Sequence, residues 1–415
     1  MNSAVAVPGR TTDLTDTPKA DVSIAHWLHR HFVRVTSGGR FLPCVDGLRF
    51  IAILSVVLYH LNHYVVARAS GFSELDARSC VLFHWLNGAN CGVQVFFAIS
   101  GFILALPFAR ERQSGSQRVS LKHYYLRRLT RLEPPFVVNL LLVFVLLVVV
   151  KKESVQSLIA PLLATMTYTH DWIYGELSRI NGVTWSLEIE VQFYLLAPLI
   201  ARFLFGLSPS HRRTLLGVAI IAMIVSKMVV PVDGSLRLRL GLLYVLDHFL
   251  AGILVADVFV NDWKESPRRC GAWDLVTLLT LPALFAIQRS DVLLHLLPIF
   301  SFAALVSAFR GRVSNRILSW WPLVLIGGMC YSIYLYHFFV ISLIGRLTMP
   351  LAAGHSYAVQ ILLQAVVIIP ITLAVCAVFF VAVERPFMQW RPLRLKKVSG
   401  TNSAQHPPGH SAIGS

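Results

Sequence analysis

One apolar stretch of the chain, from Asp46 to His60, contains an arginine and a histidine, which are residue types that bind anions and move protons. An α-helix turns about 100° per residue, so the spacing of eleven residues from Arg49 to His60 places both within about 20° of one face. Ionisable groups are costly inside a bilayer, so two of them on one face indicate a buried working site. A neutral imidazole titrates near physiological pH, which makes His60 a candidate general base.

Both residues also have a structural interpretation. His60 is as consistent with a histidine hydrogen-bonded inside a helix bundle, and Arg49 with an arginine whose side chain reaches the cytoplasmic membrane boundary. Arg49 stays charged at almost any depth, so in the interior it requires an anionic partner. This stretch alone leaves the alternatives open.

A pair of arginines occurs in the segment YYLRRLTRLEPPF. Arg128 and Arg131 are three residues apart, hence on one helical face. Two guanidinium groups so arranged suit the binding of phosphate. Taken alone, the pair is explained as well by the excess of positive charge that marks cytoplasmic loops.

Two further apolar segments carry ionisable residues. In TWSLEIEVQFYLLAP, Glu188 and Glu190 point to different faces of a helix, so the two carboxylates have different roles. A buried carboxylate requires a partner, and an ion pair that fixes helix packing is the structural alternative. In CYSIYLYHFF, the side chains of Tyr331, Tyr334 and His337 share one face; interface anchoring explains the tyrosines more easily than the histidine.

Depth links these residues. At a rise of about 1.5 Å per residue, His60 lies roughly 21 Å above the inner end of its helix. Glu190 comes to roughly 22 Å and His337 to roughly 21 Å in a hydrocarbon core about 30 Å thick. The spacing therefore predicts a polar cavity in the outer half of the membrane, with the arginine pair as an anion site beneath it.

Three other residues have a weaker signal. Ser100, beside Gly101 in FFAISGFILALPF, lacks a G-x-S-x-G elbow, so tight helix packing is favoured over a nucleophilic serine. Cys80 and Cys91 are compatible with a disulfide in an oxidising compartment, but two unrelated thiols are favoured.

Composition identifies the class of protein that holds these residues. The 415 residues are 55% hydrophobic and only 14% charged, which indicates a polytopic membrane protein. The net charge of +16 comes from short Lys and Arg clusters between apolar runs, so it reflects membrane topology and not nucleic-acid binding. The chain shows no pattern of a cleavable signal peptide, and its six cysteines form no CxxC pair of the kind that holds a metal.

The apolar runs predict an all-α membrane helix bundle of about ten transmembrane helices plus one re-entrant or interfacial segment, 155–169. On that model the inside segments hold 27 Lys and Arg and the outside loops hold 9, with Lys227 inside a helix, so both termini are expected in the cytoplasm. The runs lie near 46–67, 89–109, 132–150, 155–169, 185–205, 214–230, 240–260, 273–287, 292–309, 320–345 and 358–383.

Three regions follow from this division. Residues 1–40 are expected to form a cytoplasmic segment with an amphipathic helix from Ile24 to Val35 that lies on the membrane surface. Residues 41–392 form the membrane domain. Residues 393–415 are expected to be a disordered cytoplasmic tail.

These motifs, in this order, resemble the acyltransferase-3 family of integral membrane O-acyltransferases. The resemblance covers about residues 43–392 and rests on DGLRFIAILSVVLYH, FFAISGF, RRLTRLEPPF, WSLEIEVQFYLLAP, YSIYLYH and VERPF. The positions that match the family's motifs are Arg49, His60, Arg128, Arg131, Trp185, Ser186, Leu187, Glu190, Tyr331, Ser332, His337, Glu384, Arg385 and Pro386.

The resemblance implies transfer of an acyl group, most simply acetyl, from acyl-coenzyme A to a hydroxyl of a carbohydrate or glycosylated acceptor such as a cell-surface polysaccharide, in the inner membrane of a bacterium. His60 is expected to be the general base, with Glu190 orienting it, and Arg49 to hold the donor or to steady developing charge. Arg128 and Arg131 are expected to bind the donor's phosphates. The acceptor site is expected to include Trp185, Ser186, Tyr331, Tyr334 and His337.

Two rival functions remain at this stage. The first is a proton-coupled secondary transporter that uses His60, Glu190 and His337 as a relay, although the chain shows no repeated halves. The second is a non-catalytic partner in polysaccharide assembly. Two features bear on the family resemblance: Glu133 follows the arginine pair where the family has no acid, and the chain is expected to be the stand-alone form without an extracytoplasmic hydrolase-like domain.

Overall fold

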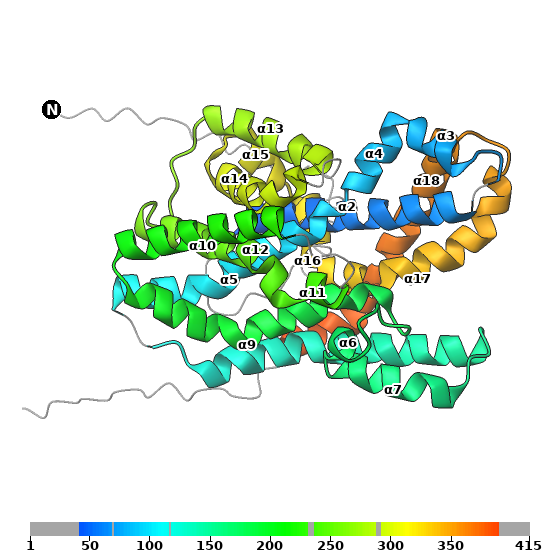
Figure 1. The fold of residues 1–415 in the computed structure, drawn as a ribbon, viewed down its shortest axis with the longest axis horizontal. Coiled ribbons are helices and arrows are strands. Elements are labelled where there is room, and N and C mark those ends of the chain that lie inside the picture. The colour runs from blue at the N-terminus through cyan, green and yellow to red at the C-terminus, as the bar shows by residue number, and fades with distance from the viewer. Residues whose placement is uncertain (1–40, 69, 116–117, 231–235, 288–291, 390–415) are drawn as a thin grey trace, which may run out of the picture.

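The structure, a computed structural model, describes residues 41–68, 70–115, 118–230, 236–287 and 292–389. Every regular element within these ranges is a helix, and the helices pack as a bundle (Figure 1), which confirms the all-α fold class. The amphipathic helix expected from Ile24 to Val35 and the tail expected at 393–415 lie outside the described residues. All six cysteines lie within them and are free thiols, so Cys80 and Cys91 form no disulfide in this structure.

Eight helical segments of the described residues are long and apolar enough to cross a membrane. Each has at least 18 residues, hence a length of about 27 Å or more, which is close to the thickness of a hydrocarbon core. The helices that form them are α2 (Pro43–Arg68), α4 and α5 (Val81–Gly88 and Cys91–Ser114), α6 (Leu121–Val149), α9 (Trp185–Gly206), α11 and α12 (Leu236–Arg239 and Leu242–Asn261), α14 with the 3-10 helix before it (Leu293–Leu296 and Leu297–Arg310), α17 (Cys330–Thr348) and α18 with α19 (Tyr357–Phe379 and Arg385–Gln389).

The expected count of ten crossings is not confirmed. Helix α13 (Ala272–Ala286) has 15 residues and spans only about 22 Å. Helix α10 (Pro209–Val229) has 21 residues, but three of them are the cations Arg212, Arg213 and Lys227, which lower its hydropathy. Helix α7 (Val155–Met166) has 12 residues and is too short to cross, as its sequence predicts.

Helix α5 is at the centre of the bundle and packs against α12, α9, α2 and α14. Its crossing with α12 depends on two glycines: a Cβ atom on Gly101 would lie 2.1 Å from the Phe249 carbonyl oxygen, and one on Gly252 would lie 2.0 Å from the Ala98 carbonyl oxygen. Small residues of this kind let two membrane helices approach closely. The packing interpretation of the Ser100–Gly101 pair is therefore confirmed for Gly101.

Two irregularities interrupt the last crossings. The apolar run 320–345, which the sequence presents as one segment, is divided at Met329 into α16 (Trp321–Gly328) and α17. The final crossing contains a π-helical turn, Phe380–Glu384, between α18 and α19. Such turns are rare and often occur at functional sites, because the wider turn redirects a side chain.

Candidate active site

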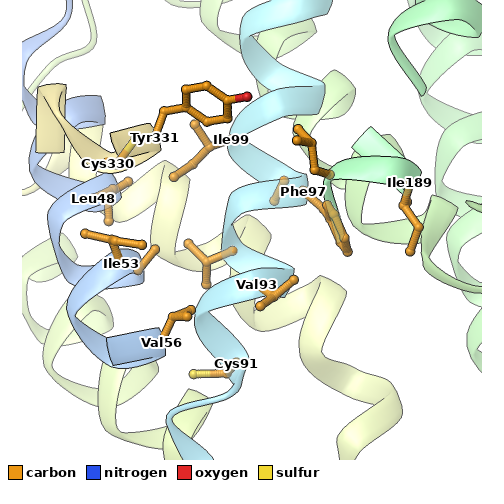
Figure 2. Packing of buried hydrophobic residues seen from close by; sticks show 14 of the residues in the cluster. Leu48, Ile53, Val56, Cys91, Val93, Phe97, Ile99, Ile189, Cys330 and Tyr331 are labelled. Carbon is orange, nitrogen blue, oxygen red and sulfur yellow. The ribbon is translucent and has the colours of Figure 1, made fainter. Parts of the chain in front are cut away.

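A cavity lies between α2, α5, α6, α9 and α17, and it contains about 870 Å³ of empty space, including solvent at its open mouth. That volume is in the range of small-molecule sites. Figure 2 shows four residues of its lining: Val56 from α2, Val93 and Phe97 from α5, and Tyr331 from α17. The polar lining consists of Arg49, Ser100, Arg128, Arg131, Ser186, Glu190, Tyr194, Cys330, Tyr331 and Tyr334.

Arg128 and Arg131 reach this cavity from the first part of α6, which begins after the N-cap Ser120. Within the described residues, no carboxylate oxygen lies within ion-pair distance of either guanidinium group. The guanidinium of Arg128 lies over the rings of Tyr124 and Tyr194, 5.8 and 5.6 Å from their centroids. The Nε atom of Arg131 is buried without a hydrogen-bond partner. The two side chains thus present positive charge to a cavity, as a phosphate site requires.

Arg49 is buried inside the bundle, with 8% of its surface exposed, and lines the same cavity. Its Nη1 atom donates to Asp46 Oδ1 at 2.5 Å, one helical turn earlier in α2. Arg49 is therefore a buried, ion-paired side chain inside the bundle and does not extend along its outer surface. The anionic partner that a buried arginine needs comes from its own helix.

Glu190 lies in the cavity wall, and its partners are two hydroxyl groups. Ser100 Oγ donates to Glu190 Oε1 at 2.5 Å, and the Tyr194 hydroxyl donates to the same oxygen. The structure thus gives Glu190 partners other than His60, to which the sequence assigned it. Sequence reasoning missed Ser100 and Tyr194 as cavity residues; the spacing of four residues from Glu190 to Tyr194 was a usable signal, whereas the contact with Ser100 joins residues 90 positions apart.

Glu188 points to a different place from Glu190, as their spacing predicts. It lies beside α8 (His170–Tyr174), where its Oε2 atom accepts the backbone N–H of Asp171 at 3.3 Å. Burial, and secondarily the nearby Glu188 carboxylate, raises the pKa of Asp171 to about 7. Burial lowers the pKa of His170, whose Nδ1 atom is 3.8 Å from Asp171 Oδ1. Asp171 and Glu188 do not line the cavity, and neither forms an ion pair with a Lys or Arg side chain of the described residues.

His60 and His337 come together, although they are on different helices. Their ring centroids are 5.1 Å apart and the ring planes are inclined by 51°. His337 is completely buried, and the edge of the Phe338 ring also meets His60, with centroids 5.5 Å apart. Neither histidine lines the cavity, but Val56, one helical turn before His60, does. The two histidines that the sequence puts at one predicted level are thus neighbours in the structure, but they do not share the cavity with Glu190.

Of the other residues predicted to bind the acceptor substrate, three line the cavity and one lies outside it. Ser186 Oγ is 3.1 Å from the Tyr334 hydroxyl, which donates to the carbonyl oxygen of Val183. The Tyr331 hydroxyl donates to the Leu132 carbonyl oxygen at 2.9 Å. These three side chains line the cavity, whereas Trp185 packs against the hydrophobic core and is not part of the lining.

The last of the matching motifs, VERPF, contributes the carboxylate of Glu384, which lies close enough to Arg131 to interact with it electrostatically. Glu384 is completely buried at the end of the π-helical turn. Its Oε2 atom accepts the backbone N–H of Ser332 at 3.2 Å and the Ser332 hydroxyl at 2.7 Å, which fixes the carboxylate at the start of α17. It interacts electrostatically with Arg131 without making an ion-pair contact.

Glu133, the acid that departs from the family pattern, is turned away from the arginine pair. Its Oε1 atom accepts the Tyr168 hydroxyl at 2.8 Å, and it does not line the cavity. The positive charge of Arg128 and Arg131 is therefore not neutralised by the adjacent acid in the sequence. Cys330, which sequence reasoning did not consider, lies in the cavity wall at the α16–α17 break.

Comparison with known proteins gives one family. The model of a family described as "Acyltransferase domain" matches residues 42–381. The O-acetyltransferase OatA of Staphylococcus aureus strain NCTC 8325 is 27% identical over 355 residues, which cover 79% of this chain and 55% of that protein. A second protein, from Staphylococcus aureus strain COL and provisionally named an O-acetyltransferase, is 26% identical over 394 residues, which cover 85% of this chain and 59% of that protein.

The chain therefore spans a little more than half of the length of the curated relatives that it matches. No solved structure matches it.

Proposed function

The chain belongs to this acyltransferase family of integral membrane enzymes, and on that premise we propose that it is a membrane O-acetyltransferase. The donor is acyl-coenzyme A, most simply acetyl-coenzyme A, and the acceptor is a hydroxyl group of a carbohydrate or another glycosylated molecule. The observation that carries the proposal is the cavity in which Arg128 and Arg131 have no carboxylate ion-pair partner among the described residues. Positive charge in that state suits a polyanionic donor.

The residues that line the cavity near Arg128 and Arg131 suit the binding of this donor. The guanidinium groups of Arg128 and Arg131 would hold phosphate oxygens by charge-assisted hydrogen bonds. The apolar wall above them, which includes Val56, Val93 and Phe97, suits the less polar arm that carries the thioester. Val56 is four residues before His60, about 6 Å along α2, so the wall leads from the arginines toward the imidazole.

His60 acts as general base in this proposal. It takes the proton of the acceptor hydroxyl while that oxygen forms a bond to the thioester carbonyl carbon. The carbon–sulfur bond then breaks, and the thiolate leaves and is protonated. Arg49 at the cavity wall is placed to steady negative charge that develops on the donor. Direct transfer of this kind needs no acyl-enzyme.

The orientation in the membrane follows from the donor. Coenzyme A is cytoplasmic, so Arg128 and Arg131 should face the cytoplasm, with both chain termini on that side of a bacterial plasma membrane. The acceptor then approaches from the His60 end. A transporter that relays protons through His60, Glu190 and His337 is less well supported, because the partners of Glu190 are Ser100 and Tyr194.

The direct test is acyl transfer by the purified protein in lipid nanodiscs. We expect acetyl label to pass from acetyl-coenzyme A to hydroxyl groups of bacterial surface glycans or glycolipids, and His60→Ala to abolish the transfer. His63→Ala is the matched control, because His63 is an exposed histidine on the same helix and does not line the cavity; it should retain wild-type transfer.

Mass spectrometry of the acceptor pool then identifies the acceptor by the mass of the acyl group that it gains. The proposal fails if the wild-type protein transfers no label to any glycan or glycolipid fraction but drives uptake of a solute into vesicles. It also fails if His60→Ala, correctly inserted, transfers label as fast as His63→Ala.

A further inference from the structure

The environment of His337 gives it one defined tautomer. Its Nδ1 atom is 2.9 Å from the carbonyl oxygen of Ile333 and 2.9 Å from that of Tyr334, both in the preceding turn of α17. A carbonyl oxygen only accepts hydrogen bonds, so Nδ1 must carry the proton. In a neutral imidazole the other nitrogen, Nε2, then has a free lone pair.

That lone pair has no partner among the residues that the structure describes. His337 is completely buried, and its Nε2 atom makes no hydrogen bond. A buried acceptor without a donor carries a free-energy cost, so its retention calls for a function. The other imidazole beside it is that of His60, with ring centroids 5.1 Å apart.

Glu190 does not supply His60 with an orienting acceptor. Its Oε1 atom accepts two hydrogen bonds, from Ser100 and from Tyr194, in the cavity wall. The described groups in ring contact with His60 are His337, Tyr59 and Phe338. Of these three, only His337 has a buried acceptor atom without a hydrogen-bond partner among the described residues.

We propose that His337 is the positioning residue for His60. Its Nε2 lone pair accepts the N–H of one His60 ring nitrogen, which holds the other His60 nitrogen unprotonated and ready to take the acceptor's proton. The proposal rests on the proposed function of His60 as the base. A carboxylate plays the equivalent part in serine hydrolases, where it selects the tautomer of the catalytic histidine. Here the selecting group is a neutral imidazole, itself fixed by two carbonyl oxygens.

No hydrogen bond joins the two rings in the present conformation. Hydrogen bonds of this kind are often long in enzymes without substrate and shorten when the substrate is bound. No proton passes to His337 in this scheme: the acceptor hydroxyl gives its proton to His60, and the Nδ1–H of His337 remains on its two carbonyl oxygens throughout.

Two substitutions at His337 separate positioning from packing. His337→Phe fills the space but has no acceptor, whereas His337→Gln places an amide oxygen near the position of Nε2. We expect His337→Phe to lower kcat by about 100-fold with the KM for acetyl-coenzyme A unchanged, because Arg128 and Arg131 are intact. We expect His337→Gln to recover at least about a tenth of the wild-type kcat, well above the Phe variant.

A second readout does not depend on turnover. In protein labelled with ¹⁵N-histidine, the His60 resonances, assigned with His60→Ala, should show one neutral tautomer in wild type and His337→Gln. Both tautomers should appear in His337→Phe.

The outcomes distinguish this inference from the proposed function. A wild-type kcat in His337→Phe, or equal loss in the Phe and Gln variants, overturns the role of His337 and leaves His60 as the base. An unchanged His60 tautomer in His337→Phe overturns it as well. Absence of any acetyl transfer by wild-type protein instead removes the proposed function, while the resonances still report whether His337 selects the His60 tautomer.

Discussion

Arginines occur inside two regions of the bundle. Their charge is paired with carboxylates in one region and is unpaired, among the described residues, in the other. Between α10 and α12, Asp257 accepts from both Arg212 and Arg213, and Lys227 Nζ is 2.6 Å from Asp247 Oδ2. Both carboxylates are completely buried. In the central cavity, Arg128 and Arg131 lie beside empty space with no carboxylate at ion-pair distance among the described residues.

The difference distinguishes charges that stabilise the fold from charges that we propose bind the donor. Buried ions are costly unless they are paired, so the α10–α12 pairs are what makes α10 compatible with its position beside α12. Arg128 and Arg131 are only partly buried and have no such pair. The Glu384 carboxylate interacts electrostatically with Arg131 but makes no ion pair with it among the described residues. A cavity that is lined by unpaired cations is suited to bind an anionic ligand.

The largest expected effect comes from breaking the paired region. Asp257→Asn leaves Arg212, which is 2% exposed, without its anion, so we expect a loss of about 3–5 kcal/mol in stability. Thermal unfolding in nanodiscs measures this. Arg213→Ala removes the half-buried member of the same cluster and should cost less. Protein of either variant that remains folded should bind acetyl-coenzyme A normally; weakened binding would mean that the two regions are not separate.

Removal of a cavity arginine should have the opposite pattern. Arg131→Ala removes a charged hydrogen-bond donor, so donor affinity should fall by roughly 10- to 100-fold, corresponding to about 1.5–3 kcal/mol. Stability without donor should fall by no more than about 1–2 kcal/mol, because the substitution removes the electrostatic interaction with Glu384 but no ion pair. Isothermal titration with acetyl-coenzyme A checks this. A large loss of thermal stability with unchanged affinity would assign Arg131 to packing.

Glu384 tests the boundary between the two regions. Glu384→Gln keeps the hydrogen bonds from Ser332 but removes the negative charge near Arg131. We expect stability without donor to fall by about 1–2 kcal/mol and coenzyme A to restore it, because the donor's phosphates supply the missing charge. The measurement is the rise in Tm on addition of coenzyme A, which should be larger than in wild type. A smaller rise would contradict this role.

A pH-dependent effect is expected at the acids beside α8. The folded-state pKa of Asp171, about 7, is above its ordinary value of 3.8, so the folded protein binds this proton more tightly than the unfolded chain does. Its contribution to stability is therefore complete below about pH 4 and is lost as the pH rises through 7. In Asp171→Asn, Tm should fall less between pH 5 and 8 than in wild type. Parallel curves for the two proteins would contradict the assignment.

The sequence predicts the all-helical class well. Hydrophobic runs predict the helices but not how many of them can cross a membrane. A fixed rise per residue puts His60 and His337 at one predicted level, and in the structure their rings are neighbours. Depth does not determine which way a side chain faces its neighbours. Glu190, predicted at the same level, bonds to Tyr194 on its own helix and to Ser100, which the packing of α5 against α9 brings close.

Charge pairing is equally hidden from local sequence. Arg128 with Arg131 and Arg212 with Arg213 both read as cations that follow the positive-inside pattern. Only the second pair has a carboxylate partner. That partner is Asp257, which is 45 residues from Arg212 and comes close only when α10 packs beside α12. The predicted number of crossings depends on the same pairing. The three cations of α10 lower its mean hydropathy, although carboxylates outside α10 pair with them in the structure.

The most direct test measures donor binding and acetyl transfer together in one variant, His60→Ala. We expect this protein to bind acetyl-coenzyme A with wild-type affinity, because Arg128 and Arg131 are intact, and to transfer no acetyl group. Transfer at the wild-type rate by this variant would show that the imidazole is not the base. Loss of donor binding would show that His60 and the arginines do not have separate roles.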